Sequence, residues 1–395
     1  MFILISNSVS VHNLMNPMGA EKMSRTNQTI QTRLPEFDLL RSLAIIGVVI
    51  IHITAPLDLY AHQGVFVYYL FVSIHLAQRF CVPVFLIISG FFLTYKIENQ
   101  QNPTLILKKR LLRIIPPYLF WSSFFYFLDV VLGERNFNLF LLLKDLLTGS
   151  VVGSYYFVVL IIQFYVLWWL LSKLKVWNYT KLLMISLGIQ IIITSYLYYY
   201  LFQVHYFPVI DLMYRFIAAW SFYFVLGLCL GNNYEKIKRI IQKLKFPLVL
   251  MNLVFLVLSI IEFYIIDGLN LVNTINPQTE ITGAKLETAI SYWRISSQLY
   301  SVAFFLLIIS FHSTNFLPSG VTQIVKKISE YSFAIYLIHQ PILWKLFFRV
   351  FNLLGTGSLA SFLVILVLDL GICYGLIYLG CKFLPKKYSR YVFGL

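Results

Sequence analysis

The stretch Asp38–Pro56, DLLRSLAIIGVVIIHITAP, decides how this chain is organised. Its apolar run is long enough to cross a bilayer as a helix, yet it contains Asp38, Arg41 and His52. At about 100° per residue, Arg41 and His52 lie within roughly 20° of each other, and Asp38 lies about 40° from His52. The three polar side chains therefore share one face, which should point to protein or water and not to lipid.

Two interpretations of this polar face are open. A charged residue at the centre of a membrane helix costs about 2.5–3.5 kcal/mol on insertion scales, so such residues usually have a function. The alternative is a structural network in which Asp38 pairs with Arg41 and His52 is simply hydrogen-bonded. His52 lies roughly 16 Å further along the helix axis than Arg41, so Asp38 is too distant to orient the ring of His52 directly.

Composition places the chain among membrane proteins. Of its 395 residues, 59% are hydrophobic and only 12% are charged, which excludes an ordinary soluble protein. Repeated apolar runs near twenty residues predict an all-α polytopic membrane protein, because barrel strands need only about ten alternating residues. The net charge of +15 does not indicate nucleic-acid binding, since the basic residues cluster between apolar runs. The four cysteines lack metal-ligand spacing, so we expect no metal.

Ten apolar segments are predicted to cross the membrane. They are residues 38–56, 78–95, 113–132, 155–172, 182–203, 212–230, 247–266, 295–311, 332–350 and 359–381. If the N-terminus is cytoplasmic, the inside segments carry 22 Lys and Arg residues and the outside segments carry 3. Cytoplasmic loops are enriched in such residues, so this bias predicts that both termini are cytoplasmic. The apolar run VFVYYLFVSI within residues 57–77 is too short to span, which favours a re-entrant or interfacial segment.

Two basic residues open the third predicted span, in the motif KKRLLRIIPPY. Arg110 and Arg113 are neighbours at i and i+3, and the guanidinium group suits bidentate contacts with phosphate. The alternative is that they only anchor the cytoplasmic end of the helix. In the second span, the small pair Ser89 and Gly90 favours close helix packing, and no nucleophile motif surrounds Ser89.

A second polar site is predicted in the ninth span, YSFAIYLIHQPILW. His339 and Tyr336 lie there, with Gln340 and Lys345 nearby, and either a functional or a structural role fits them. Further polar residues fall near the predicted outer ends of the spans. They line an outward-facing pocket or are merely interfacial: His62, His75, Arg79, Asp129, His205, Asp211 and Arg215.

Taken together and in this order, these motifs resemble the acyltransferase-3 family of bacterial membrane proteins. The family's Arg and His of the first helix are matched by Arg41 and His52. The other matches are Ser89-Gly90-Phe91, Arg110 and Arg113 followed by Pro116-Pro117-Tyr118, and Tyr336-Leu337 with His339. The resemblance covers about residues 33–385. Residues 1–32 are then a polar cytoplasmic N-terminal tail, and residues 386–395 are a basic cytoplasmic C-terminal tail.

The resemblance implies an O-acyltransferase of the cytoplasmic membrane. Such enzymes move an acyl group, usually acetyl, from cytoplasmic acyl-CoA to a carbohydrate outside the membrane. His52 would be the general base, because an unperturbed imidazole titrates near neutral pH. Arg41, Arg110 and Arg113 would bind the phosphates of the donor. The expected partners are acyl-CoA as co-substrate, a cell-surface or lipid-linked glycan and the bilayer, with no nucleic acid and no permanently bound cofactor.

Two departures from the family pattern indicate which branch of the family the chain resembles. Asp38 is followed by Leu39 where the family often has glycine, and no extracellular esterase-like domain is recognisable. The chain therefore resembles the stand-alone branch, which includes exopolysaccharide modifiers and the intercellular-adhesion C proteins. An exporter or flippase for a surface polysaccharide is the alternative function. It would need no catalytic histidine, and internal inverted repeats, which would favour it, are not visible.

Overall fold

The computed structural model of the chain describes residues 33–57, 60, 63–95, 102–174, 178–196, 213–265, 290–311, 317–354 and 357–395. The chain divides into two units, Met1–Leu34 and Pro35–Leu395. The predicted N-terminal tail, residues 1–32, lies outside the described residues. Within the described ranges every regular element is helical, as the composition predicts.

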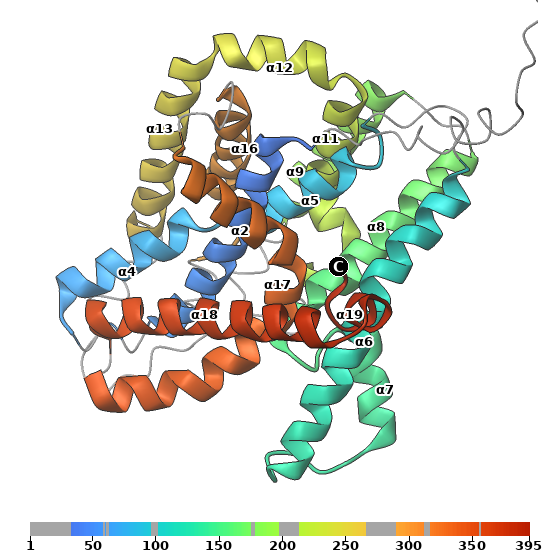
Figure 1. Ribbon diagram of the computed structural model, residues 1–395. Helices are drawn as coiled ribbons and strands as arrows, with labels where there is room; N and C mark the ends of the chain where they lie inside the picture. The colour runs from blue at the N-terminus through green and yellow to red at the C-terminus, as the bar shows by residue number, and fades with distance from the viewer. Residues whose placement is uncertain are drawn as a thin grey trace, which may run out of the picture. The chain divides into compact units, whose positions relative to one another are not determined.

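The helices of the second unit are shown in Figure 1. In chain order they are α2 (Pro35–Thr54), α4 (Val65–Ala77), α5 (Cys81–Phe91), α6 (Pro103–Val131), α7 (Leu139–Thr148), the 3-10 helix η1 (Gly153–Tyr155), α8 (Tyr156–Lys173), α9 (Tyr179–Tyr196), the 3-10 helix η3 (Ile217–Trp220), α11 (Ser221–Asn232), α12 (Tyr234–Lys243), α13 (Lys245–Phe263), α16 (Ile295–Ser310), α17 (Ser319–Leu354), α18 (Leu359–Phe383) and α19 (Lys386–Phe393).

Seven helical segments of the described chain are long and apolar enough to cross a membrane. They are Pro35–Thr54, Val65–Phe91, Pro103–Val131, Gly153–Lys173, Tyr179–Tyr196, Lys245–Phe263 and Leu359–Phe383. The three remaining predicted spans also coincide with helices. Ile217–Asn232 and Ile295–Ser310 are apolar but shorter, and residues 332–350 lie inside the 36-residue helix α17. The length and composition of these helices indicate a membrane protein, while ten crossings and the orientation of the termini stay predictions.

The second span begins earlier than its sequence pattern predicts. The run VFVYYLFVSI falls in α4, and a turn at residues 78–80 joins α4 to α5, so that Val65–Phe91 forms one apolar segment of 27 residues. Helix α4 alone has 13 residues, so a re-entrant or interfacial position for this run stays a prediction. Arg79 interrupts the hydropathy of the sequence within that turn, and a buried arginine cannot be distinguished from a loop residue by hydropathy alone.

Helix α2 lies at the centre of the packing. It contacts α4, α5, α16, α17 and α18, and it is the blue helix in the middle of Figure 1. Pro35 starts the helix and Glu36 and Asp38 lie in its first turn, where negative charge is favourable. Ser42 Oγ donates a hydrogen bond to the carbonyl of Val325 at 2.7 Å, which ties α2 to α17.

Helices α5 and α11 pack backbone against backbone, because both present glycine at the crossing. A Cβ added at Gly90 would lie 2.1 Å from the Phe224 carbonyl oxygen, and one added at Gly227 would lie 2.1 Å from the Ile87 carbonyl oxygen. Small residues allow this close approach between membrane helices. The packing role predicted for the Ser89-Gly90 pair is thereby confirmed.

The C-terminal residues 386–395, predicted as a basic tail, form the short helix α19 and its cap. Phe393 is buried, and Trp121 Nε1 of α6 donates a hydrogen bond to the Val392 carbonyl at 2.8 Å. This segment therefore combines basic residues with residues that pack against the rest of the protein, and α19 contacts α6 and α18.

Candidate active site

Two histidines meet between α2 and α17. The ring centroids of His52 and His339 are 5.2 Å apart, and the rings are tilted by 45°. His339 is fully buried, whereas His52 is half-buried. The sequence pattern placed His339 and Tyr336 in a possible second polar site. The packing of α17 against α2 instead brings His339 beside His52.

The hydrogen bonds of His339 determine its tautomer. Its Nδ1 lies 2.8 Å from the Tyr336 carbonyl oxygen and 3.1 Å from the Ile335 carbonyl oxygen. A carbonyl oxygen can only accept, so Nδ1 carries the proton and the neutral ring has its lone pair on Nε2. That Nε2 is buried and has no hydrogen-bond partner among the described residues. His339 therefore retains an unused acceptor beside His52.

Tyr336 supports this arrangement by fixing α17 against η1. Its hydroxyl donates to the Ser154 carbonyl, and the Gln340 side chain accepts from the Ser154 N–H at 2.9 Å. The Tyr155 hydroxyl donates in turn to the Leu337 carbonyl. These contacts hold the turn of α17 that carries His339. Lys345, which the sequence placed in the same patch, instead pairs with Glu134 at an exposed position.

A third histidine reaches the site from α4. His75 Nε2 lies 2.7 Å from Arg79 Nη2, and His75 Nδ1 lies 2.8 Å from the Thr54 hydroxyl. Arginine can only donate, so Nε2 of His75 accepts and Nδ1 donates to Thr54. The Thr54 hydroxyl donates to the Ile50 carbonyl at 2.8 Å. Arg79 thus donates to His75, His75 donates to Thr54, and Thr54 donates to Ile50. Because one ring nitrogen accepts and the other donates, His75 is neutral.

At the other end of α2, Arg41 and Arg110 both contact Phe92, the residue that caps α5. The Arg41 guanidinium lies over the Phe92 ring, 4.8 Å from its centroid, and Arg110 Nη2 donates to the Phe92 carbonyl at 2.8 Å. Two of the three predicted donor-binding arginines are thus brought together. Arg41 also pairs with Asp38 at 3.7 Å, and Asp38 accepts a hydrogen bond from Ser329 at 2.7 Å.

Arg113, the third of these arginines, points to the end of the chain. Its Nε donates to the Gly394 carbonyl at 2.9 Å, and it lies within electrostatic range of Arg110 and Arg390. The Asp38–Arg41 pair of the structural interpretation is therefore present. His52 does not belong to that pair and faces His339 instead.

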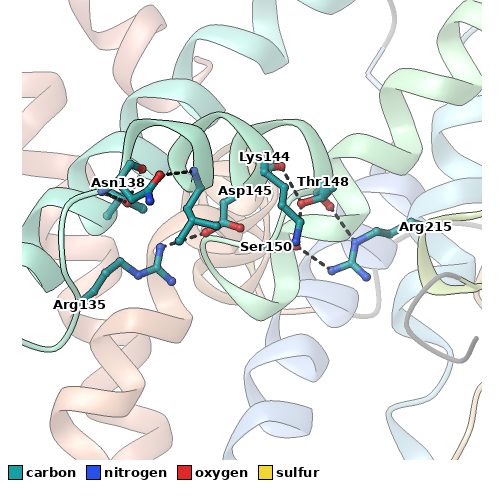
Figure 2. A network of polar contacts seen from close by, with 9 residues as sticks. Arg135, Asn138, Lys144, Asp145, Thr148, Ser150 and Arg215 are labelled. Atoms are coloured by element: carbon teal, nitrogen blue, oxygen red, sulfur yellow. Dashed lines mark hydrogen bonds and ion pairs between the residues drawn. The ribbon is translucent and has the colours of Figure 1, made fainter. Parts of the chain in front are cut away.

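Of the seven outer polar residues named from the sequence, His75 and Arg79 reach the histidine site. Arg215 lies elsewhere: its Nε donates to the Thr148 carbonyl at 2.8 Å, next to Ser150 at the end of α7. Figure 2 shows this network, which Arg135 extends by pairing with Asp145 at 3.0 Å. Asp129 is half-buried on α6. His62, His205 and Asp211 lie outside the described residues.

One sequence pattern indicates that the third histidine, His75, has a charged neighbour. His75 and Arg79 stand at i and i+4, the spacing at which helical neighbours touch. The contact between His52 and His339 had no such local signal, because 287 positions separate them. Within the described parts of the chain, no group of three or more His, Cys, Asp or Glu residues could hold a metal ion.

Comparisons with known proteins agree with this picture. A protein of Staphylococcus aureus strain N315 is 26% identical over 312 residues, which cover 75% of this chain and 78% of the relative. A protein of Staphylococcus epidermidis is 30% identical over 235 residues, which cover 55% of this chain and 56% of the relative. Each relative is described as a probable poly-beta-1,6-N-acetyl-D-glucosamine export protein. No solved structure matches the chain significantly.

The family model of the acyltransferase-3 proteins, described as an acyltransferase domain, matches residues 34–378. This range includes both histidines of the site and the three arginines at the opposite end of α2. The chain therefore belongs to the acyltransferase-3 family and is related to polysaccharide export proteins.

Proposed function

We propose that this protein is a membrane-embedded O-acyltransferase. It moves an acyl group, with acetyl as the expected group, from cytoplasmic acyl-CoA to a cell-surface or lipid-linked carbohydrate. The observation that carries the proposal is the buried contact between His52 and His339, with an unused acceptor at His339 Nε2. Family membership supports it independently.

In this mechanism His52 removes the proton from a sugar hydroxyl. The hydroxyl oxygen forms a bond to the thioester carbonyl carbon, and the carbonyl oxygen becomes negatively charged. When the carbon–sulfur bond breaks, the CoA thiolate leaves and takes the proton from His52. General base catalysis of this kind contributes about 10²–10⁴ in rate. His339, whose tautomer is fixed by its carbonyl contacts, lies beside His52 with its Nε2 lone pair unused among the described residues.

The donor is proposed to enter from the other end of α2. Arg41, Arg110 and Arg113 lie there, and a guanidinium group is suited to bidentate contacts with phosphate. The axial separation between Arg41 and His52 is roughly 16 Å. The phosphates of acyl-CoA would bind at the arginines, and its thioester would lie at the histidines.

The proposed orientation puts the arginine end in the cytoplasm. Contacts between segments assigned to the same side support it. Glu36 at the start of α2 pairs with Lys238 of α12. Lys345, near the predicted outer end of the ninth span, pairs with Glu134 of a predicted outside segment. The test is labelling of single cysteines at two exposed positions, Lys236→Cys and Asn136→Cys, with a membrane-impermeant reagent. Opposite accessibility is expected, and labelling of both from one side would exclude the ten-crossing arrangement.

The acyl transfer itself is tested with purified protein. Labelled acetyl-CoA is supplied with and without a β-1,6-linked N-acetylglucosamine oligosaccharide, chosen from the descriptions of the relatives. We expect acetyl-oligosaccharide to form, and the release of free CoA to rise when acceptor is present. Other glycans serve as comparison acceptors. Absence of transfer to every acceptor, from protein that binds acetyl-CoA, would contradict the proposal.

Polysaccharide export is the second candidate, because the relatives carry that description. An exporter would move glycan across a sealed vesicle and would not consume acetyl-CoA. Reconstitution in sealed vesicles separates the two functions. Glycan translocation without acetyl-CoA, unchanged in His52→Gln, would favour the exporter over the acyltransferase.

A further inference from the structure

Arg79 is a buried cation in the turn between α4 and α5. It is only 5% exposed, and within the described residues no Asp or Glu forms an ion pair with it. Its Nε atom is buried and has no hydrogen-bond partner there. A buried charge is costly unless it is paired and hydrogen-bonded, so an arginine in this state is suited to meet an anion.

Two contacts hold the guanidinium in place without neutralising it. His75 Nε2 accepts from Nη2 at 2.7 Å, and the Tyr292 ring lies under the guanidinium, with its centroid 4.3 Å from Cζ. A planar guanidinium can stack on an aromatic face and still present N–H groups at its edge. The contacts therefore fix the plane of the group while donors such as Nε–H remain available.

A series of hydrogen bonds connects Arg79 to α2, the helix that carries His52. The Thr54 hydroxyl oxygen accepts a hydrogen bond from His75 Nδ1–H, and the Thr54 O–H donates to the Ile50 carbonyl on the backbone of α2. Thr54 is two residues beyond His52. Arg79 lies within electrostatic range of His52 and Tyr156, and Tyr156 directly follows η1, which contacts Tyr336. Arg79 thus belongs to the histidine site.

We propose that Arg79 binds the oxyanion formed on the thioester carbonyl during acyl transfer. The inference rests on the proposed function. As the acceptor oxygen bonds to the carbonyl carbon, its proton passes to His52 and the carbonyl π electrons move onto oxygen. The N–H donors of Arg79 then stabilise that oxygen until the carbon–sulfur bond breaks and the thiolate recovers the proton. Donors fixed in advance in a site of low dielectric are worth about 10²–10³ in kcat.

The test measures acetyl transfer by purified full-length variants. Arg79→Gln should lower kcat about 100- to 1,000-fold while the KM for acetyl-CoA changes little. Arg79→Lys keeps the charge but loses the planar fork, so its kcat should fall by a smaller factor. In Arg79→Ala, added guanidinium chloride should restore part of the lost rate. Arg215→Gln is the matched control, because that half-buried arginine bonds to Thr148 and Ser150 in a separate network (Figure 2) and should keep normal kcat.

The outcomes separate this inference from the function on which it rests. If the wild type transfers acetyl, His52→Ala does not, and Arg79→Gln is close to normal, the role of Arg79 is wrong and the function stands. If Arg79→Gln, Arg79→Lys and the guanidinium-treated Arg79→Ala all lose folded protein and activity together, Arg79 is a structural cation and the inference is also wrong. If the wild type binds acetyl-CoA and transfers nothing, both fail.

Discussion

At the end of α2 that carries Arg41, the guanidinium groups contact carboxylate or carbonyl oxygens, whereas Arg79, near His52, contacts an imidazole nitrogen and a tyrosine ring. Arg41 pairs with Asp38, and Arg110 and Arg113 bond to backbone carbonyls. Near His52, by contrast, Arg79 bonds to an imidazole and stacks on a tyrosine. Protein oxygens therefore accept hydrogen bonds or ion pairs from the cations of the first end, whereas within the described residues no carboxylate pairs with Arg79.

The same contrast holds for hydrogen bonding. At the arginine end, Arg110 and Arg113 donate hydrogen bonds to the carbonyls of Phe92 and Gly394. At the histidine end, His339 Nε2 and Arg79 Nε are buried without partners in the described chain. Unmet hydrogen-bonding groups in a site of low dielectric interact strongly with a substrate that satisfies them. We infer that the arginine end serves as scaffold and donor anchor, and that the histidine end carries the chemistry.

Removing His52 should have the largest effect. As general base it contributes about 10²–10⁴ in rate, which is roughly 3–5 kcal/mol of barrier. His52→Ala should therefore nearly abolish acetyl transfer while the protein still inserts and binds acetyl-CoA. Rates are measured at matched protein concentration, and binding is measured by calorimetry. If acetyl-CoA binding falls as much as the rate, His52 has a structural role. The two ends of α2 would then not differ in function as we infer.

The arginine end should respond in donor binding. Arg110→Ala or Arg113→Ala removes a charge-assisted contact worth about 1.5–3 kcal/mol, so the Kd for acetyl-CoA should rise about 10- to 150-fold. Salt should weaken donor binding to the wild type more than to either variant. Lys at either position should rescue only part of the affinity. A double Ala variant that binds acetyl-CoA normally and is merely produced in lower amount would show that both residues are structural anchors.

The smallest effect on chemistry is expected from the packing that supports the arginine end. Gly90→Ala forces a methyl group against the Phe224 carbonyl, 2.1 Å from the ideal Cβ position, at a cost of about 1–3 kcal/mol. The yield and thermal stability of the protein should fall while kcat of the folded fraction persists. Gly371→Ala on α18 is the matched control, since nothing lies within 4 Å of its Cβ position. Equal losses in both variants would contradict close packing at Gly90.

Local sequence patterns predicted much of the fold. Apolar runs identified membrane helices, and the i, i+3 spacing predicted the Asp38–Arg41 pair that the structure contains. The limits of α4 and α5 were not predictable, because Arg79 reads as a break in hydropathy although its side chain is buried. Charge bias predicts sidedness only, so the number of crossings and the orientation await the labelling experiment.

The site was only partly predictable from sequence for a similar reason. His52 could be identified from the helical face that it shares with Arg41. That His339 lies against it depends on the packing of α17 on α2, which no local pattern encodes. Which ring nitrogen of His75 accepts a hydrogen bond and which donates one is known only from its contacts with Arg79 and Thr54. No sequence pattern predicts which nitrogen makes each contact.

The most direct test of the central claim is acetyl transfer by His52→Gln at matched protein amount. Glutamine keeps hydrogen-bonding capacity but cannot act as a base. If His52 is the general base, the Gln variant should fail about as badly as His52→Ala, with a rate loss of about 10²–10⁴ and intact binding of acetyl-CoA. Near-normal transfer by His52→Gln would contradict the catalytic assignment and shift it to His339.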